Sequence, residues 1–385
     1  MKHIGRYRFV WRTVRACLSP WLRRKFNYSA ELCTAEGPLL VLSNHNTDWD
    51  PLLLSLSFPD YMSFVASEHI FRWGFVAKLI IFLVNPIARL KGKTAGDTAL
   101  TMMRRLRGGC SVAMFAEGNR SFNGVTGDIL PATGKLARSS GASLVTFRMD
   151  GGYFTSPRWC GSKLRRGKMT GRVVNVYRPE ELKAMSAEEI NAAIRRDLFV
   201  DAYAVQRGEM TPFRGKNLAE GLETVLCRCP GCGAMDTLHS HGDLLSCDCG
   251  FSVRYNAYGF FEGADAPFDN LTDWDNAQTE ALCAMIPADD SVIFSDTEMS
   301  LREILSDHSV AELGTGTLAL YADRLECCGH IFRLRELGGF ALHGAQNVDF
   351  SADGHSYEIS SLRRRCTRKY MLVIQHLLAE PAEKT

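Results

Sequence analysis

The chain has 385 residues, of which 46% are hydrophobic and 23% are charged. This composition is ordinary for a soluble globular protein, and the length is sufficient for two or three domains. The net charge of +2 hides an uneven distribution, because residues 1–220 carry a net +15 and the remainder a net −13. The basic part predicts an anionic partner: a phosphorylated substrate, a membrane surface or a nucleic acid. The acidic part argues against a nucleic-acid role for the whole chain.

Residues 1–30 are predicted to form a basic amphipathic helix. Apolar residues, two tryptophans among them, recur at helical spacing, and no acidic residue precedes Glu31. Such a helix suits the interface of a bilayer, and the alternative is a helix packed on its own domain with its arginines in water. Because the segment is apolar only in stripes, we expect no cleavable signal peptide. The prediction is a cytoplasmic protein, peripheral to the inner face of the membrane.

Residues 31–220 alternate between strand-like and helical patterns. A second apolar segment, residues 73–90, is interrupted by Lys78, Asn85 and Pro86, so we interpret it as a buried or interfacial helix, not a spanning one. The alternation predicts an α/β domain with a mixed, largely parallel sheet flanked by helices. Strands are expected at 38–43, 61–66, 110–115, 143–149 and 172–177, and helices from Pro51, at 94–106, at 133–140 and at 186–206.

The stretch VLSNHNTDWDPLLL, residues 41–54, places His45 in a loop five residues before Asp50. Asp50 and Pro51 before a leucine run are typical of an N-cap and a first-turn proline. On one regular helix the two side chains would point about 140° apart. A loop that folds back can instead bring the imidazole to the carboxylate, which fixes the tautomer and makes the other ring nitrogen a general base. A plain helix cap beside a loop histidine is the alternative.

A second stretch, VAMFAEGNRSFNG at 112–124, runs from a strand into a polar turn. The guanidinium of Arg120 at the end of a strand is a good receptor for phosphate, and Gly118 allows close approach of the backbone. The alternative is a solvated surface arginine.

Together the two stretches resemble the glycerolipid acyltransferase family, typified by bacterial 1-acylglycerol-3-phosphate acyltransferases. That family carries Asn-His-x4-Asp and, about seventy residues on, Phe-Pro-Glu-Gly-Thr-Arg-Ser. The departures are Ala116 for the proline and Asn119 for the threonine, and Thr146 stands where a later block has a proline. The resemblance covers about residues 30 to 200. The matching residues are Asn44, His45 and Asp50 in the first block, and Phe115, Glu117, Gly118, Arg120 and Ser121 in the second.

The resemblance implies acyl transfer without a catalytic cofactor. His45 would deprotonate an acceptor hydroxyl, which attacks the thioester of acyl-CoA or acyl-carrier protein, and Asp50 would orient His45. Arg120 would bind the acceptor phosphate, with Glu117 and Gly118 shaping that site. The family's intermediate basic block resembles IARLKGKTAGDTA, which points to Arg89 as a further phosphate ligand and less directly to Lys91 and Lys93.

Residues 224–262 resemble a zinc ribbon. Of thirteen cysteines, five fall between Cys227 and Cys249, and without a secretory signal such clustering favours metal over disulfides. A Cys-Pro-Gly-Cys-Gly turn is followed by Cys-Asp-Cys-Gly, and four thiolates from two turns can hold a structural zinc ion. The predicted ligands are Cys229, Cys232, Cys247 and Cys249, with Cys227, His239 and His241 as alternatives.

After Phe261 we expect an acidic linker and then, at 285–385, a β-rich domain that ends in a helix and resembles the pleckstrin-homology fold. Such a domain could hold a lipid headgroup or a partner. A basic cluster near its end is interpreted either as a membrane-facing patch or as a solvated helix terminus. The cluster is Arg363, Arg364, Arg365, Arg368 and Lys369.

The function predicted from these features is a membrane-peripheral acyltransferase that acts on a lysophosphatidate-type acceptor. Its partners would be a lysophospholipid, an acyl donor and a membrane surface, with no nucleic acid. Two alternatives stay open: an acyltransferase for another lysolipid or a glycolipid, and a catalytically silent platform that binds lipid or protein.

Overall fold

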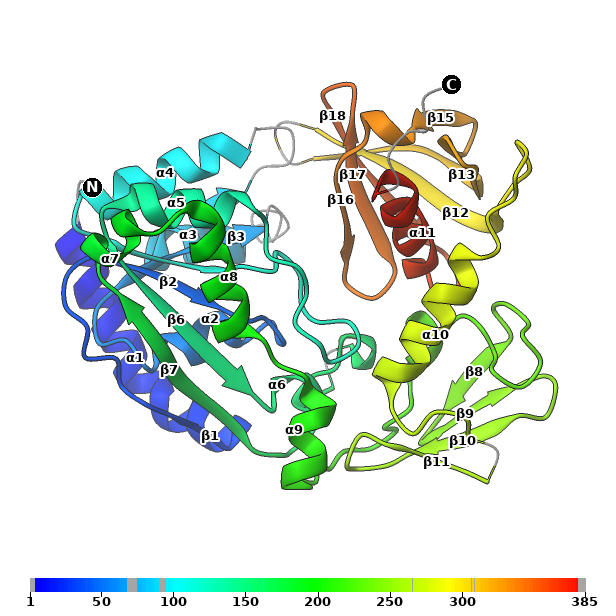
Figure 1. Cartoon of the computed structure of the whole chain (residues 1–385), viewed down its shortest axis with the longest axis horizontal. Coiled ribbons are helices and arrows are strands. Elements are labelled where there is room, and N and C mark those ends of the chain that lie inside the picture. Colours follow the sequence, from blue (N-terminus) through cyan, green and yellow to red (C-terminus); the bar gives the residue numbers. More distant parts are fainter. Residues whose placement is uncertain are drawn as a thin grey trace. The chain divides into compact units, whose positions relative to one another are not determined.

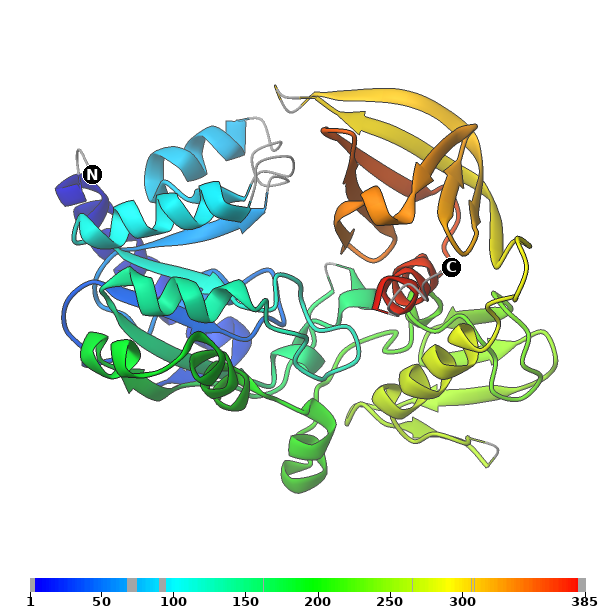
Figure 2. The same cartoon turned by 45° about the horizontal axis from the view of Figure 1, so that its top comes forward.

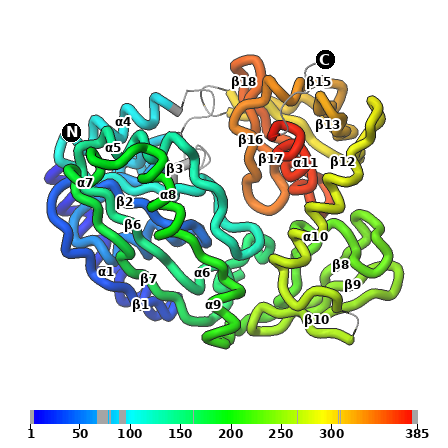
Figure 3. The backbone as a smooth tube through the Cα atoms, viewed as in Figure 1, coloured from blue at the N-terminus to red at the C-terminus, as the bar shows by residue number. Residues whose placement is uncertain are grey.

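The computed structural model describes residues 4–67, 75–89, 95–161, 163–264, 266–305, 307 and 309–379 (Figure 1). The chain divides into two compact units. The first comprises residues 1–158 and 164–214, and the second comprises residues 159–163 and 215–385. The ribbon and the C-terminal β-rich region therefore belong to the same unit, and the path of the chain through each unit can be followed in Figure 3.

The first unit is built on a seven-stranded sheet in the order β1-β7-β6-β2-β5-β3-β4. All neighbouring strands are parallel except β6 and β7, so the sheet is mixed and largely parallel, as the sequence predicts. Two short edge strands, β1 and β4, were not predicted. The strands are β1 (Tyr28–Ala30), β2 (Leu39–Ser43), β3 (Met62–Ser67), β4 (Ile87–Arg89), β5 (Ser111–Phe115), β6 (Ser143–Asp150) and β7 (Met169–Tyr177).

Helices flank this sheet, and two of the expected helices were wrong in extent. The segment expected as one helix at 186–206 is two, because residues 199–201 are extended and the Asp201 carboxylate caps α9. The helix expected at 73–90 ends at Val84, where Asn85 has a left-handed φ of 38° and Pro86 leads into β4. The helices are α1 (Ile4–Phe26), α2 (Asp50–Ser55), α3 (Phe75–Val84), α4 (Ala95–Arg107), α5 (Ala132–Ser140), α6 (Gly152–Thr155), α7 (Pro179–Ala184), α8 (Ala187–Leu198) and α9 (Ala202–Glu209).

Strand β2 lies at the middle of the sheet and is buried along its whole length. Alternate side chains enter two different cores, because successive residues of a strand point to opposite faces. Leu39 and Val41 pack with residues of α1 and α2, whereas Leu40 and Leu42 pack with residues of α4, α5, α7 and α8. The loop that follows β2 is therefore fixed at its base by both hydrophobic cores.

Helix α1 packs on its own unit, which agrees with the second interpretation of the sequence, a helix packed on its own domain. Its residues Trp11, Leu22 and Phe26 are buried. Phe9 and Trp21 nevertheless remain 73% and 46% exposed. The helix thus buries one apolar face against its own unit, and two aromatic rings and several arginines remain at the surface. Within the part of the chain that the structure describes, no helix is both long and apolar enough to cross a membrane.

The second unit begins with a four-stranded antiparallel sheet in the order β11-β10-β9-β8. The segment expected as an acidic linker contains instead helix α10 (Leu271–Cys283), capped by Asn270. Trp274 and Leu282 make it a packed helix, because both side chains are buried. The strands are β8 (Leu238–His241), β9 (Leu244–Cys247), β10 (Ser252–Tyr255) and β11 (Phe261–Glu262).

The C-terminal region is a curved antiparallel sheet in the order β15-β14-β13-β12-β18-β17-β16, with helix α11 (Arg368–Ala379) beside it (Figure 2). β12 pairs with both β13 and β18, so the first and last strands of the region are neighbours. The resemblance to a pleckstrin-homology fold stays a prediction. The strands are β12 (Phe294–Ile304), β13 (Val310–Leu320), β14 (Arg324–Cys327), β15 (His330–Arg333), β16 (Gly338–His343), β17 (Asn347–Ala352) and β18 (His355–Ser361).

The basic cluster before and within α11 is divided. The Arg363 and Arg364 side chains are 67% and 51% exposed, whereas those of Arg365, Arg368 and Lys369 are largely buried in ion pairs. Lys369 is 2% exposed and pairs with Asp236 and, at 2.9 Å, with Asp296. Arg365 also bonds Asp296, and Arg368 forms a buried pair with Asp275. Although burial raises the pKa of Asp296, the Lys369 ammonium lowers it overall. These charges join the ribbon, α10, β12 and α11 of one unit.

Candidate active site

The loop after β2 carries His45 and is held by hydrogen bonds at each of its first residues. The Asn44 side chain donates to the carbonyl of Met149 and accepts from its N–H, both at 2.8 Å. This pairing fixes the loop to strand β6. Because β2 and β5 are parallel neighbours, their carboxyl ends lie at the same edge of the sheet, which brings the turn after β5 against His45.

Asp50 folds the loop back on itself. Its Oδ2 atom accepts from the N–H of Asn46 at 2.6 Å and of Thr47 at 2.9 Å, and Oδ1 accepts from the Thr47 hydroxyl at 2.6 Å. Asp50 is not the N-cap that the sequence predicted: Trp49 occupies that position and Asp50 is the first residue of α2. The carboxylate points into the preceding loop because three donors there satisfy it.

The same Oδ2 atom lies 2.8 Å from Nδ1 of His45. The Asp50 side chain is fully buried and that of His45 is 19% exposed. The imidazole stacks on Phe115 with ring centroids 4.2 Å apart. With Asp50 ionised, the proton sits on Nδ1 and Nε2 is the basic nitrogen, an assignment that follows from the hydrogen bond. The pair can therefore take a proton from a hydroxyl group.

The Glu117 carboxylate is bonded to backbone N–H groups of the chain. One carboxylate oxygen accepts from the N–H of His45 and the other from the N–H of Gly127, each at 2.7 Å. Burial raises the pKa of Glu117 to about 8, although both N–H donors oppose that shift. The backbone of His45 is held at its other end as well, because its carbonyl accepts from the N–H of Ser121 at 2.9 Å. Residues after β5 thus hold the backbone of His45 by hydrogen bonds to its N–H and to its carbonyl.

Arg120 is largely engaged within the chain. Its Nε donates to the carbonyl of Asn46 at 2.8 Å, and Nη2 donates to the carbonyl of Ser156 at 2.5 Å. Nη1 pairs with Asp48 at 3.0 Å, and the Asp48 side chain is 78% exposed. Only this last partner is free to move into solvent, so a phosphate could reach Arg120 through Nη1. Gly118 adopts a φ of 71°, which favours glycine at the turn.

Of the four remaining positions from the family resemblance, only Thr146 has a described side chain. Arg89 is on strand β4, and its side chain is outside the described residues, as are Lys91 and Lys93. Thr146 is fully buried on β6 and its hydroxyl donates to Asp197 at 2.9 Å, away from the His45 loop. The departure at Thr146 therefore concerns the packing of β6 against α8.

Sequence reasoning missed Thr47 and Ser156. Thr47 supplies two of the donors to Asp50, and its position three residues before a helix-initiating aspartate is the signal that could have identified it. Ser156, which accepts from Arg120, lies 36 residues away in the sequence, and no local pattern marks it.

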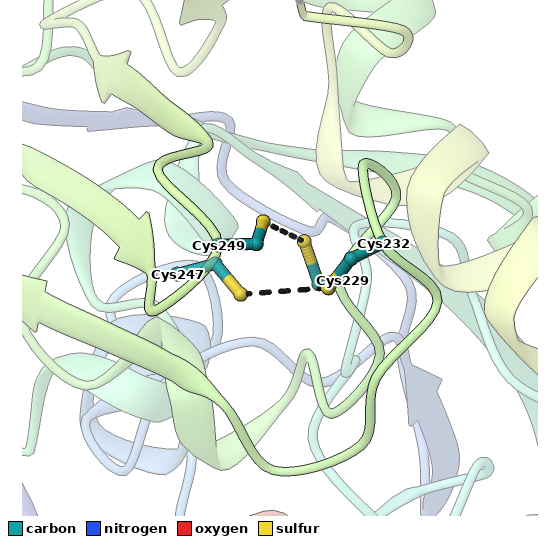
Figure 4. A group of neighbouring side chains, drawn as sticks. All are labelled: Cys229, Cys232, Cys247 and Cys249. Carbon is teal, nitrogen blue, oxygen red and sulfur yellow. Dashed lines mark hydrogen bonds between the residues drawn. The ribbon is translucent and has the colours of Figure 1, made fainter.

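Four cysteines in the second unit converge from two turns (Figure 4). Cys229 and Cys249 have their sulfurs 3.8 Å apart, as do Cys232 and Cys247, and all four sulfurs lie within 4.8 Å of one another. A tetrahedral ion with four sulfurs at about 2.3 Å places them about 3.8 Å apart, so this set fits a structural zinc ion. The predicted alternatives lie elsewhere: the N–H of Cys227 donates to Gln278, and His239 pairs with Asp248.

The largely parallel sheet thus carries, at the carboxyl end of its middle strand, a loop histidine bonded to a buried aspartate. The family model described as Acyltransferase matches residues 25–150. This part of the chain belongs to that family, which confirms the resemblance to glycerolipid acyltransferases. A search of the curated proteins found no match. Among solved structures, the chain is similar to the 1-acyl-sn-glycerophosphate acyltransferase PlsC from Thermotoga maritima, at 16% identity and a TM-score of 0.41, covering 51% of this chain and 79% of the other.

Proposed function

We propose that the protein transfers a fatty acyl group from a thioester donor, acyl-CoA or acyl-carrier protein, to the hydroxyl of a lysophosphatidate-type acceptor at a membrane surface. The observation that carries this proposal is the 2.8 Å contact between His45 Nδ1 and Asp50 Oδ2 inside an acyltransferase-family domain. The solved structure similar to this chain is described as an acyltransferase for this same type of acceptor.

In the proposed reaction, Nε2 of His45 takes the proton of the acceptor hydroxyl while its oxygen attacks the thioester carbonyl carbon. The tetrahedral intermediate collapses with cleavage of the C–S bond, and the thiolate leaves with the proton from the imidazolium. Asp50 holds Nδ1–H and stabilises the positive charge on the ring. Glu117 holds the His45 backbone, which makes it a positioning residue. The nucleophile belongs to the substrate, so the chain needs to supply only a base and a fixed geometry.

Membrane contact is proposed through α1 and α3. Phe9 on α1 and Phe82 on α3 are 73% and 53% exposed, and Ile81 beside the latter is 41% exposed. The Arg6 guanidinium lies 4.5 Å from the Phe82 ring, so a basic group lies beside an exposed aromatic ring. That combination favours the interface of an anionic bilayer.

A different acceptor is the second candidate. The engagement of Arg120 with Asn46, Asp48 and Ser156 favours it, because a guanidinium that already holds three oxygens has less capacity to bind a phosphate. The acceptor could then be another lysolipid or a glycolipid with the same hydroxyl chemistry.

The test is acyl transfer from labelled acyl-CoA and acyl-carrier protein to lysophosphatidate, glycerol 3-phosphate and neutral lysolipids, with wild type and His45→Ala. We expect product with lysophosphatidate that disappears in the variant. An increase in the KM for phosphate-bearing acceptors in Arg120→Ala would support the phosphate role. Product with neutral lysolipids alone would favour the second candidate, and no product with any pair would favour a silent binding platform.

A further inference from the structure

Asp48 lies in the His45 loop, at a position that the Asn-His-x4-Asp pattern leaves open. Its Oδ2 atom lies 3.0 Å from Nη1 of Arg120, and the two side chains are 78% and 13% exposed. In the part of the chain that the structure describes, Arg120 is the only residue with which this carboxylate forms a hydrogen bond. A carboxylate of the chain itself therefore occupies the nitrogen at which an acceptor phosphate would meet Arg120.

The Arg120 guanidinium cannot turn away from this position to meet a ligand elsewhere. Nε and Nη2 donate to the carbonyls of Asn46 and Ser156, at 2.8 and 2.5 Å, and both of these residues are buried. Nη1 instead has the exposed partner, Asp48. A phosphate beside that carboxylate would be repelled by its charge. The phosphate must therefore take the place of Asp48 on Nη1.

The Asp48 side chain can leave Arg120 without disturbing the backbone of the loop. The N–H of Thr47 donates to the Asp50 carboxylate at 2.9 Å, and the N–H of Trp49 donates to the Thr47 hydroxyl at 3.1 Å. The N–H of Asp50 also donates to the carbonyl of Thr47 at 3.1 Å. None of these bonds uses the Asp48 carboxylate, so a rotation of that side chain is enough to release Nη1.

We propose that Asp48 competes with the acceptor phosphate for Arg120 and is thereby a specificity-determining residue of the acceptor site. The inference rests on the proposed function and names the residue that sets the affinity of this site for phosphate monoesters. Because the competitor belongs to the same loop, its local concentration is high, and it weakens the binding of every anion to Nη1 by the same factor. Glycerol 3-phosphate has only its small polar headgroup to offset this factor, whereas lysophosphatidate can also bury its acyl chain.

The experiment compares the full-length protein with Asp48→Asn, which keeps the size of the side chain and removes its charge. Titration calorimetry gives the Kd of glycerol 3-phosphate. Acyl transfer gives the ratio of kcat/KM for lysophosphatidate to kcat/KM for monoacylglycerol, an acceptor without a phosphate. We expect the Kd to fall and the ratio to rise, each about three- to tenfold, because an ion pair with one exposed partner contributes about this much to an equilibrium.

Asp60→Asn is the matched control. Asp60 also pairs with an arginine of the first unit, Arg12, at 3.2 Å, and its side chain is 57% exposed. The control thus removes an exposed ion pair of the same kind away from Arg120, and it should change neither the Kd nor the ratio. Equal gains in Asp60→Asn and Asp48→Asn would show an effect of net charge alone and would overturn the competition.

Arg120→Ala separates competition from repulsion by the Asp48 charge. In that background, Asp48→Asn should change the ratio less than about twofold, because nothing is left for the carboxylate to occupy. Equal gains with and without Arg120 would overturn the competition in favour of repulsion, and so would the absence of any gain in Asp48→Asn alone. Asp48 is exposed, so the single variant tests the proposal even if Arg120→Ala does not fold.

Calorimetry needs no acyl donor, which keeps this test apart from that of the reaction. Tighter binding of glycerol 3-phosphate by Asp48→Asn, with a wild type that transfers no acyl group, would refute the proposed reaction and leave the competition intact. Acyl transfer by the wild type, with an unchanged Kd and ratio in Asp48→Asn, would refute the competition and leave the reaction intact.

Discussion

Asp50→Asn isolates the electrostatic part of the proposed mechanism. The amide oxygen can still accept from Nδ1 of His45 and from the loop N–H groups, and the amide NH2 can donate to the Thr47 hydroxyl, so the loop geometry is retained. The negative charge beside the imidazolium is lost. With charge centres about 4 Å apart and an effective dielectric constant of about 20, the attraction is about 4 kcal/mol. That corresponds to a decrease in kcat of about a thousandfold.

The assay is steady-state acyl transfer at saturating donor and acceptor, with circular dichroism and thermal melting to verify the fold. Thr47→Val is the matched control, because it removes a bond to the same carboxylate without removing charge. We expect that control to lower kcat about tenfold at most. A folded Asp50→Asn protein with a kcat within tenfold of wild type would show that Asp50 only organises the loop and that charge stabilisation of His45 is not part of the mechanism.

Four further predictions follow from particular contacts. Above pH 8, where Glu117 is ionised, Glu117→Gln sets an amide NH2 against one of two backbone N–H donors, so kcat should fall there about 10–100-fold without a change in the acceptor KM, whereas Asp128→Asn, an exposed control, should change neither in steady-state kinetics. Because burial raises the pKa of Glu117 from 4.5 to about 8, the native state holds a proton that the unfolded chain releases between these values. Its contribution to stability should therefore decrease as pH rises across that window, and melting curves of Glu117→Gln should show a shallower decline. Lys369→Met leaves two aspartates without their ammonium and should lower the free energy of unfolding by about 3–5 kcal/mol in urea titrations, and a change under about 1 kcal/mol would refute a structural role. Cys232→Ser or chelation should lower the melting temperature of the zinc-loaded protein, and identical curves would exclude a structural metal.

Most of the first unit could be predicted because its strands are short apolar runs between turn residues. Strands β2, β5, β6 and β7 were placed within a few residues. For β2 and β5 the reason is that a buried strand between parallel neighbours is apolar along its length. The edge strands β1 and β4 were missed, because three-residue strands carry too few side chains for a period to be detectable.

The candidate site was predictable in its residue types and less so in its contacts. His45 and Asp50 are close in sequence, so a loop between them has few ways to fold. The contacts of Glu117 could not be predicted, because its partners, the N–H groups of His45 and Gly127, are backbone atoms that no residue identity reveals. The tie between Arg120 and Ser156 depends on how β5 and the segment after β6 are placed in the sheet.

The environment of the basic cluster at α11 also could not be predicted from the local sequence. Charged residues are buried only where opposite charges come from elsewhere in the chain, and here they come from Asp236, Asp275 and Asp296. None of these lies within 70 residues of α11. The local sequence of a basic run is therefore the same whether its side chains are solvated or form buried ion pairs. α1 carries a similar density of positive charge and, within its described residues, not one carboxylate. Because a basic segment whose counter-charges lie inside the chain has less capacity left for an external anion, Arg365, Arg368 and Lys369 should contribute little to the binding of an anionic partner.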